Sequence, residues 1–155
     1  MGEIILGNRL EYILDNGSDF PVLYFYNHMD KDEISLRYDC DYFIKDGIVY
    51  EKTDTEESYG VYLIYVKVAE DEEASTFASH SAISLFKTGF HMEIRQYQED
   101  AKDYPLITTL SIRDDDDLTL KLKSNYIQAA GRKWQKTSTE IDEDRKVFVY
   151  YAIPV

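Results

Sequence analysis

Short pairs of Gly, Asn and Asp separate strand-like runs of apolar residues, and this punctuation constrains the fold more than any other feature of the sequence. The pairs are Gly7-Asn8, Asn16-Gly17 and Asp46-Gly47. Gly, Asn and Asp tolerate the positive φ angles that two-residue hairpin turns require. We therefore predict tight antiparallel hairpins at these three places, with Asn8, Asn16 and Gly47 in the turns.

The remaining runs of strand length are rich in β-branched and aromatic residues, which favour strands. We predict strands over residues 9–14, 21–26, 33–38, 43–45, 48–51, 59–68, 89–98, 105–112, 118–123 and 146–153. In the run 118–123, three leucines alternate with polar residues, as expected of a strand with one buried face. These runs predict one mainly β domain over residues 1–155, an antiparallel β-sandwich or a barrel-like sheet with one or two short helices. No internal repeat is predicted.

Two segments depart from the strand pattern. Residues 71–87 begin with three acidic residues and end near Lys87, which matches the charge preference of a helix dipole. Residues 124–136 could form a second helix capped by Ser124, although Gly131 would weaken it. We expect exposed loops at residues 99–103 and 137–144.

Composition indicates a soluble intracellular protein. The chain has 155 residues, of which 44% are hydrophobic, so it can bury a core of its own. A single cysteine excludes an intrachain disulfide framework. The N-terminus lacks the features of a signal peptide, and no apolar run approaches the length of a membrane span. We therefore expect a cytoplasmic protein without membrane partners.

Charge is distributed unevenly along the chain. The formal net charge is −13, and residues 1–117 carry −16 whereas residues 118–155 carry +3. Fourteen tyrosines form a second anomaly, because tyrosine is enriched both on sheet faces and at the centres of protein interfaces. An acidic, tyrosine-rich body is typical of a protein that attracts a basic partner.

No motif indicates catalysis or a bound cofactor. The chain has no nucleophile elbow, no Walker loop and no dinucleotide-binding glycine pattern. The run 114–117 is four consecutive aspartates, which we interpret as a solvated hairpin tip, although loose cation binding there stays open. His28 with Asp30 and His91 with Glu93 could each offer two ligands from one strand face, yet nothing in their spacing requires a metal. We expect neither a metal nor a cofactor.

The candidate binding residues form an acidic and a basic group. The acidic group combines carboxylates with tyrosines and comprises Tyr38, Asp39, Asp41, Tyr42, Glu56, Glu57 and Tyr59. The basic group comprises Lys121, Lys123, Arg132, Lys133, Trp134 and Lys136. The basic group superficially resembles a nucleic-acid surface, but the acidic remainder of the chain would repel phosphates. We therefore expect no nucleic-acid partner.

These patterns leave three classes of function open. The first is a non-enzymatic acidic protein that engages a basic protein partner, as inhibitors, immunity proteins and anti-defence proteins do. The second is a structural or assembly component, such as a phage virion protein that associates with itself through acidic and basic regions. The third is a β-barrel that encloses a small ligand.

Overall fold

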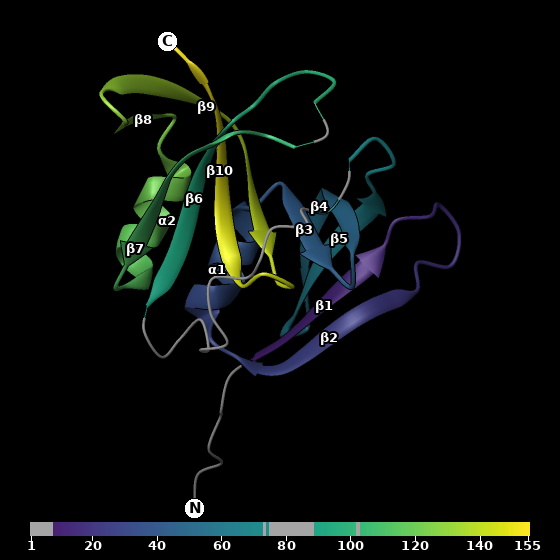
Figure 1. Ribbon diagram of the computed structural model, residues 1–155. Helices are drawn as coiled ribbons and strands as arrows, with labels where there is room; N and C mark the ends of the chain where they lie inside the picture. Colours follow the sequence, from purple (N-terminus) through teal and green to yellow (C-terminus); the bar gives the residue numbers. More distant parts are fainter. Residues whose placement is uncertain (1–7, 73, 75–88, 102) are drawn as a thin grey trace, which may run out of the picture.

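The computed structural model describes residues 8–72, 74, 89–101 and 103–155. Figure 1 shows a large twisted sheet accompanied by two short helices. Along the chain the elements are β1 (Asn8–Leu14), β2 (Val22–Met29), α1 (Lys31–Asp39), β3 (Tyr42–Lys45), β4 (Ile48–Ser58), β5 (Val61–Val68), β6 (Phe90–Gln96), β7 (Leu106–Ile112), α2 (Asp115–Lys123), β8 (Tyr126–Ala129), β9 (Arg132–Asp142) and β10 (Val147–Pro154).

All the described strands belong to one mixed sheet with the order β2-β1-β5-β4-β3-β9-β10-β6-β7, and β8 pairs with β9 off this path. The mainly β architecture with two short helices confirms the predicted fold class. The sheet is not closed into a barrel. It also contains parallel pairs, between β1 and β5, β3 and β9, and β6 and β10, so hairpins alone do not build it.

Both helices occupy segments that we predicted to be strands, and these two predictions are wrong. In α2, Leu118 and Leu122 are buried one helical turn apart, whereas Leu120 between them is 66% exposed. The Asp114 carboxylate accepts a hydrogen bond from the Asp117 backbone N–H at 2.7 Å and caps the helix. The aspartate run is therefore the cap and first turn of α2, where the helix dipole favours negative charge, rather than a hairpin tip.

One of the three predicted tight turns is confirmed: Asp46-Gly47 joins β3 to β4 with positive φ at both residues. Asn16-Gly17 does lie between the antiparallel strands β1 and β2, but the connection spans residues 15–21 and is not a two-residue turn. Asn8 is instead the first residue of β1, and Gly7 lies outside the described residues. The predicted helix 124–136 is the β8–β9 hairpin, and the predicted loop 137–144 is mostly β9. Most of the predicted helix 71–87 lies outside the described residues.

The two halves of the chain have the same architecture, so the prediction of no internal repeat is wrong. Each half runs strand, strand, helix, strand, strand, strand, with equivalent pairings: β2-β1-β5-β4-β3 in the first half and β7-β6-β10-β9-β8 in the second. We call residues 8–68 repeat 1 and residues 90–154 repeat 2. Residues at equivalent positions in the two repeats are called counterparts.

The repeat is also visible in the sequence. Residues 30–56 align without a gap with residues 114–140, so counterparts there are 84 positions apart. Identical residues include the glycines of the two hairpin turns and most of the runs KTDTE (52–56) and KTSTE (136–140). Counterparts are 82 positions apart in the first strand of each repeat and 86 positions apart in the last. With these separations, the pair of Leu10 and Tyr62 in repeat 1 corresponds to the pair of Met92 and Phe148 in repeat 2.

Equivalent contacts support the duplication. The ammonium of Lys52 donates to the backbone oxygen of Tyr38 at the end of α1, and its counterpart Lys136 donates to that of Leu122 at the end of α2. A bulge interrupts β4 after Lys52 and β9 after Lys136. Because a lysine that satisfies a helix C-terminal carbonyl holds the helix against the sheet, the same device fixes the helix in both repeats.

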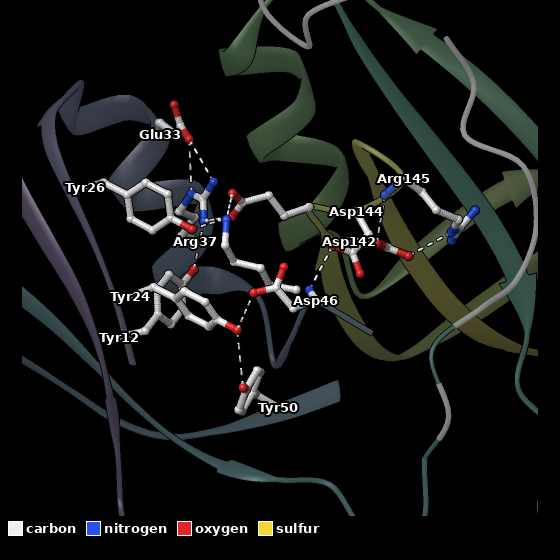
Figure 2. A network of polar contacts seen from close by, with 12 residues as sticks. Tyr12, Tyr24, Tyr26, Glu33, Arg37, Asp46, Tyr50, Asp142, Asp144 and Arg145 are labelled. Carbon is white, nitrogen blue, oxygen red and sulfur yellow. Dashed lines mark hydrogen bonds and ion pairs between the residues drawn. The ribbon is translucent and has the colours of Figure 1, made fainter. Parts of the chain in front are cut away.

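The repeats join where β3 pairs in parallel with the last residues of β9. Figure 2 shows the polar network that seals this junction. The Glu143 carboxylate, in the turn after β9, accepts hydrogen bonds from the Tyr26 hydroxyl at 2.6 Å and from Lys45 at 2.7 Å. It also pairs with the buried Arg37 at 3.2 Å. Burial alone would raise the pKa of Glu143, but these partners outweigh it and hold the pKa below its ordinary value.

The hydrophobic core is continuous across the junction. One cluster contains Leu10 and Phe43 of repeat 1 together with Met92 and Phe148 of repeat 2. The rings of Tyr12 and Phe43 stack with centroids 3.9 Å apart. The two halves therefore share buried surface as well as a sheet.

Candidate functional site

A small pocket lies at the junction of the repeats and gathers tyrosines around carboxylates. Its lining residues are Tyr42, Glu72, Tyr97, Tyr104, Ser138, Glu140 and Tyr151. The inner cavity has a volume of about 30 Å³, which is room for one or two water-sized groups. Tyr42 comes from β3 of repeat 1, whereas the strand residues opposite it come from β9 and β10 of repeat 2. The pocket therefore exists only because the two repeats are joined.

Glu140 is the buried acid of this pocket. Its side chain accepts a hydrogen bond from the Tyr151 hydroxyl at 2.8 Å, and the residue is only 4% exposed. Burial is the main cause that raises the pKa of Glu140 to about 8, and the nearby Asp142 adds to the effect. Once ionised, a carboxylate buried in this way is stabilised by a cation that lies beside it.

The aromatic rings are fixed by contacts with each other. Tyr97 stacks on Tyr104 with centroids 5.4 Å apart, and Tyr104 meets Tyr151 edge to face at 5.3 Å. The Tyr104 hydroxyl lies 3.2 Å from both carboxylate oxygens of Glu72. Burial raises the pKa of Glu72 above its usual range. Rings with fixed faces next to carboxylates make an environment that attracts positive charge.

A larger depression adjoins the pocket and shares Glu72, Tyr97 and Tyr104 with it. It has a volume of about 370 Å³, and its rim adds the carboxylates of Asp71, Glu99 and Asp100. Among the described residues, none that lines the pocket or the depression is a lysine or an arginine. The combined site is therefore acidic and lined with tyrosines.

A buried ion network supports the pocket from behind. Arg145 forms ion pairs with Glu93 at 2.9 Å and with Asp142 at 2.7 Å. Arg95 pairs with Glu93 at 2.8 Å and donates to the backbone oxygen of Tyr104 at 2.7 Å. These arginines outweigh the effect of burial and lower the pKa of Glu93 to about 2. The network fixes the position of Tyr104 in the pocket wall.

The structure does not bring the predicted acidic group together on one surface. Tyr42 lines the pocket, and the Asp41 carboxylate accepts a hydrogen bond from the Thr139 backbone N–H at 2.9 Å inside the junction. The other acidic-group residues lie outside this site. The Asp39 carboxylate pairs with Lys123 at 3.6 Å, and the Tyr38 hydroxyl donates to the backbone oxygen of Glu56 at 2.8 Å.

The end of the β4–β5 hairpin carries the rest of the acidic group. The Glu57 carboxylate accepts from the Gly60 backbone N–H at 2.8 Å. Tyr59, beside Gly60 in the turn, is fully exposed. This hairpin end is therefore a separate acidic surface on repeat 1.

The predicted basic group contains both structural and exposed members. Trp134 is buried, and Lys136 is engaged with the end of α2. Arg132 lies 5.4 Å over the Trp134 ring, and Lys133 lies 4.6 Å over the Tyr126 ring. Lys121 pairs with Asp117 within α2. The exposed cations thus lie on α2 and on the β8–β9 hairpin.

Among the described residues, no group of three or more His, Cys, Asp or Glu side chains is arranged to hold a metal ion. His28 and His91 lie on different strands, β2 and β6, which are not neighbours in the sheet. His80 lies outside the described residues. Neither described helix is long and apolar enough to cross a bilayer.

Of the pocket residues, the sequence interpretation had identified only Tyr42. Glu140, Tyr151, Tyr104 and Glu72 were missed, because they are distant in sequence and carry no local motif. The internal repeat could have pointed to Glu140, since it closes the run that matches residues 52–56. Comparisons with protein-family models, with curated proteins and with solved structures gave no match.

Proposed function

We propose that this chain is a non-enzymatic binding protein that takes a primary ammonium group of a basic partner protein into the Tyr42–Glu140 pocket. The observation that carries the proposal is the buried carboxyl of Glu140, enclosed by four tyrosines, with no lysine or arginine among the lining residues that the structure describes. A lysine side chain has the shape that such a site accepts, a thin apolar stem and a compact charged head.

The chemistry of the lining supports a cation over other ligands. An anion would meet Glu72 and Glu140 in the pocket and three more carboxylates at the rim. An ammonium would gain ion pairing from Glu140 and cation–π contact with the tyrosine rings, each about 1–2 kcal/mol or more when desolvated. The inner cavity of about 30 Å³ suits an ammonium head better than a planar guanidinium.

The raised pKa of Glu140 predicts how ammonium binding depends on pH. Because the pKa of Glu140 is raised to about 8, the carboxyl is largely protonated at neutral pH and must lose its proton to pair with a cation. Affinity for an ammonium should therefore fall about fivefold from pH 8 to pH 7 and about tenfold from pH 7 to pH 6. A lysine side chain stays charged through this range, so the dependence reports on the protein.

Calorimetric titration with a short lysine-rich peptide tests the proposal, with an arginine-rich peptide of equal length as a second probe. Glu140→Gln keeps the shape of the side chain and removes its charge, so it should weaken lysine-peptide binding at pH 8 at least tenfold. Glu57→Gln removes the same charge outside the pocket and should change affinity less than about twofold.

Three results would contradict the proposal. The first is the absence of lysine-peptide binding at about 0.15 M salt. The second is an equal loss of affinity in Glu140→Gln and Glu57→Gln, because general charge attraction would then explain binding. The third is an affinity that does not change between pH 6 and pH 8. The narrower expectation of an inhibitor, immunity or anti-defence role stays a prediction that depends on the identity of the partner.

A further inference from the structure

The junction between the repeats is one-sided. In repeat 1, β3 pairs on one side with β4 and on the other with residues 140–142 of repeat 2. Its counterpart β8 pairs with β9 alone among the described strands. The counterparts of residues 140–142 are residues 56–58 of β4, which pair with β5 and with no other strand that the structure describes. Figure 1 shows β8 well away from β4 and β5, so these two free edges cannot meet within one chain.

The free face of repeat 2 is exposed where repeat 1 is covered. Leu36 on α1 is 1% exposed, whereas its counterpart Leu120 on α2 is 66% exposed. Tyr42 on β3 is half-buried, whereas its counterpart Tyr126 on β8 is 50% exposed. An unpaired strand edge beside exposed apolar side chains is a surface for strand addition.

The two free edges also keep the side chains that make the existing junction. In that junction, the Thr139 backbone N–H and hydroxyl both donate to the Asp41 carboxylate. The counterpart of Thr139 is Thr55, whose backbone N–H donates to the Asp54 carboxylate at 2.9 Å. The counterpart of Asp41 is Asn125, whose amide oxygen can accept from the Thr55 hydroxyl. Asn125 is exposed, and Thr55 is half-buried at the edge of β4.

Charge is complementary between the same edges. The outer half of β4 carries Asp54, Glu56 and Glu57, and all three are exposed. The face around β8 carries the exposed Arg132 and Lys133. Opposite charges of this kind steer association and set its register.

Repeat 1 also contains half of a second tyrosine pocket. The Tyr65 hydroxyl donates to the Glu56 carboxylate at 2.7 Å, as Tyr151 does to Glu140 at 2.8 Å. Phe20 meets Tyr65 edge to face, as its counterpart Tyr104 meets Tyr151. Asp15 and Phe20 stand where the complete pocket has Tyr97 and Tyr104, and the tyrosine that β3 supplies is absent from this half. The counterpart of that tyrosine is Tyr126, on the free edge of repeat 2.

We propose that β8 of one chain pairs in parallel with residues 56–58 of a second copy, which repeats the internal junction between chains. The pairing sets Tyr126 opposite Glu56, as Tyr42 lies opposite Glu140. The contact is heterologous, so copies add head to tail or close into a ring. This inference concerns other surfaces than the Tyr42–Glu140 pocket and stands whether or not that pocket binds an ammonium group.

The contact between copies is weaker than the internal one, because the network of Figure 2 has few counterparts there. Leu110 replaces Tyr26, and Ala129 replaces Lys45. The two-residue turn after β4 has no residue equivalent to Glu143. Association is therefore expected to depend on concentration and on salt.

Disulfide cross-linking between two variants tests the pairing directly. Neighbouring strands lie about 4.8 Å apart, within the Cα separation that a disulfide spans. A mixture of Thr55→Cys and Asn125→Cys chains should give at least about ten times more covalent heterodimer than a mixture of Thr55→Cys with Lys31→Cys, an exposed control on α1. Equal yields from the two mixtures would overturn the proposal.

Sedimentation of the unmodified protein over a range of concentrations gives an independent readout. In a two-residue hairpin, the residues that flank the turn, here Ala129 and Arg132, form backbone hydrogen bonds with each other. Hydrogen-bonded and non-hydrogen-bonded pairs alternate along the strands, so the backbone N–H and C=O groups of Tyr126 and Gln128 point away from β9. Gln128→Pro removes an outward N–H and should weaken association about tenfold, whereas Gln128→Ala should not. A wild-type chain that stays monomeric up to about 1 mM would overturn the proposal. The cross-linking test holds even if the proline variant fails to fold.

Discussion

Replacing Glu140 by glutamine should stabilise the protein at neutral and alkaline pH. The Glu140 carboxyl is buried beside Tyr151 with its pKa raised to about 8, mainly by desolvation. Glutamine has nearly the same shape, and its amide oxygen can still accept the bond from the Tyr151 hydroxyl. The substitution therefore removes an ionisable group that is costly to bury, whether protonated or charged, while keeping the packing.

The sign and size follow from proton linkage. The carboxyl has a pKa of 4.5 in the unfolded chain and about 8 in the folded one. The folded state thus holds an extra proton between these values, and the free energy of unfolding falls as pH rises through this window. At about 1.4 kcal/mol per pKa unit, the stability lost is about 1 kcal/mol at pH 5, about 3 kcal/mol at pH 7 and about 5 kcal/mol at pH 9.

Urea unfolding of the wild type and of Glu140→Gln at these three pH values measures the effect. The difference in unfolding free energy should grow with pH in favour of the variant, by about 4 kcal/mol between pH 5 and pH 9. Any constant contribution of the amide cancels in this comparison. Glu57→Gln serves as the exposed control and should show no such growth. A difference between wild type and Glu140→Gln that stays constant with pH would refute the reasoning.

Three further predictions address the scaffold. Glu93→Gln should lower the unfolding free energy at pH 7 by about 3–5 kcal/mol, because it breaks buried ion pairs. Since the pKa of Glu93 is lowered to about 2, the difference from wild type should shrink in acid unfolding as pH falls from about 4.5 toward 2. Leu118→Ala should lower the free energy of unfolding in urea by about 2–5 kcal/mol. Leu120→Ala, measured at low protein concentration, should change it by no more than about 0.5 kcal/mol, and equal losses in the two variants would argue against helix α2. Gly47→Val and Gly131→Val should each cost about 1–2 kcal/mol by thermal unfolding, because both glycines have φ near +75°; an unchanged midpoint in either would contradict the turn.

Helix α2 shows where a sequence pattern admits two structures. Leu118, Leu120 and Leu122 alternate as in a strand, yet Leu118 and Leu122 are also spaced as neighbours on one helical face. Capping distinguishes the two, because Asp114 precedes an acidic first turn and basic residues end the segment. The charge pattern therefore indicates the helix, whereas the alternation of leucines alone indicates a strand.

The β8–β9 hairpin shows a different limit. Its turn residue Ala130 has a φ of +52°, a conformation that alanine rarely adopts, so Gly131 alone signals the turn there. Its counterpart Asp46 has a φ of +54° and belongs to an Asp-Gly pair that does predict a turn. Comparison of the two halves of the chain would have transferred that turn from residues 46–47 to residues 130–131.

The candidate site depends on long-range register more than on local pattern. The sequence marks Tyr42 as an exposed aromatic beside acids, but it does not show that β3 crosses to the other repeat and lies against Glu140. A parallel pairing between strands almost a hundred residues apart leaves no periodicity to read. The fold class was therefore accessible from turns and composition, whereas the pocket was not.

Duplication explains how one residue pair acquires two different environments. Glu56 with Tyr65 and Glu140 with Tyr151 occupy equivalent positions and form equivalent hydrogen bonds. Glu56 is exposed, whereas Glu140 is buried, since β3 covers the edge of β9 and none of the described strands covers residues 56–58 of β4 on the equivalent side. The raised pKa of Glu140 is thus a consequence of the docking of one repeat on the other, because burial is its largest cause. The pocket required no new residue type in repeat 2, only a neighbour that excludes water from a glutamate already present.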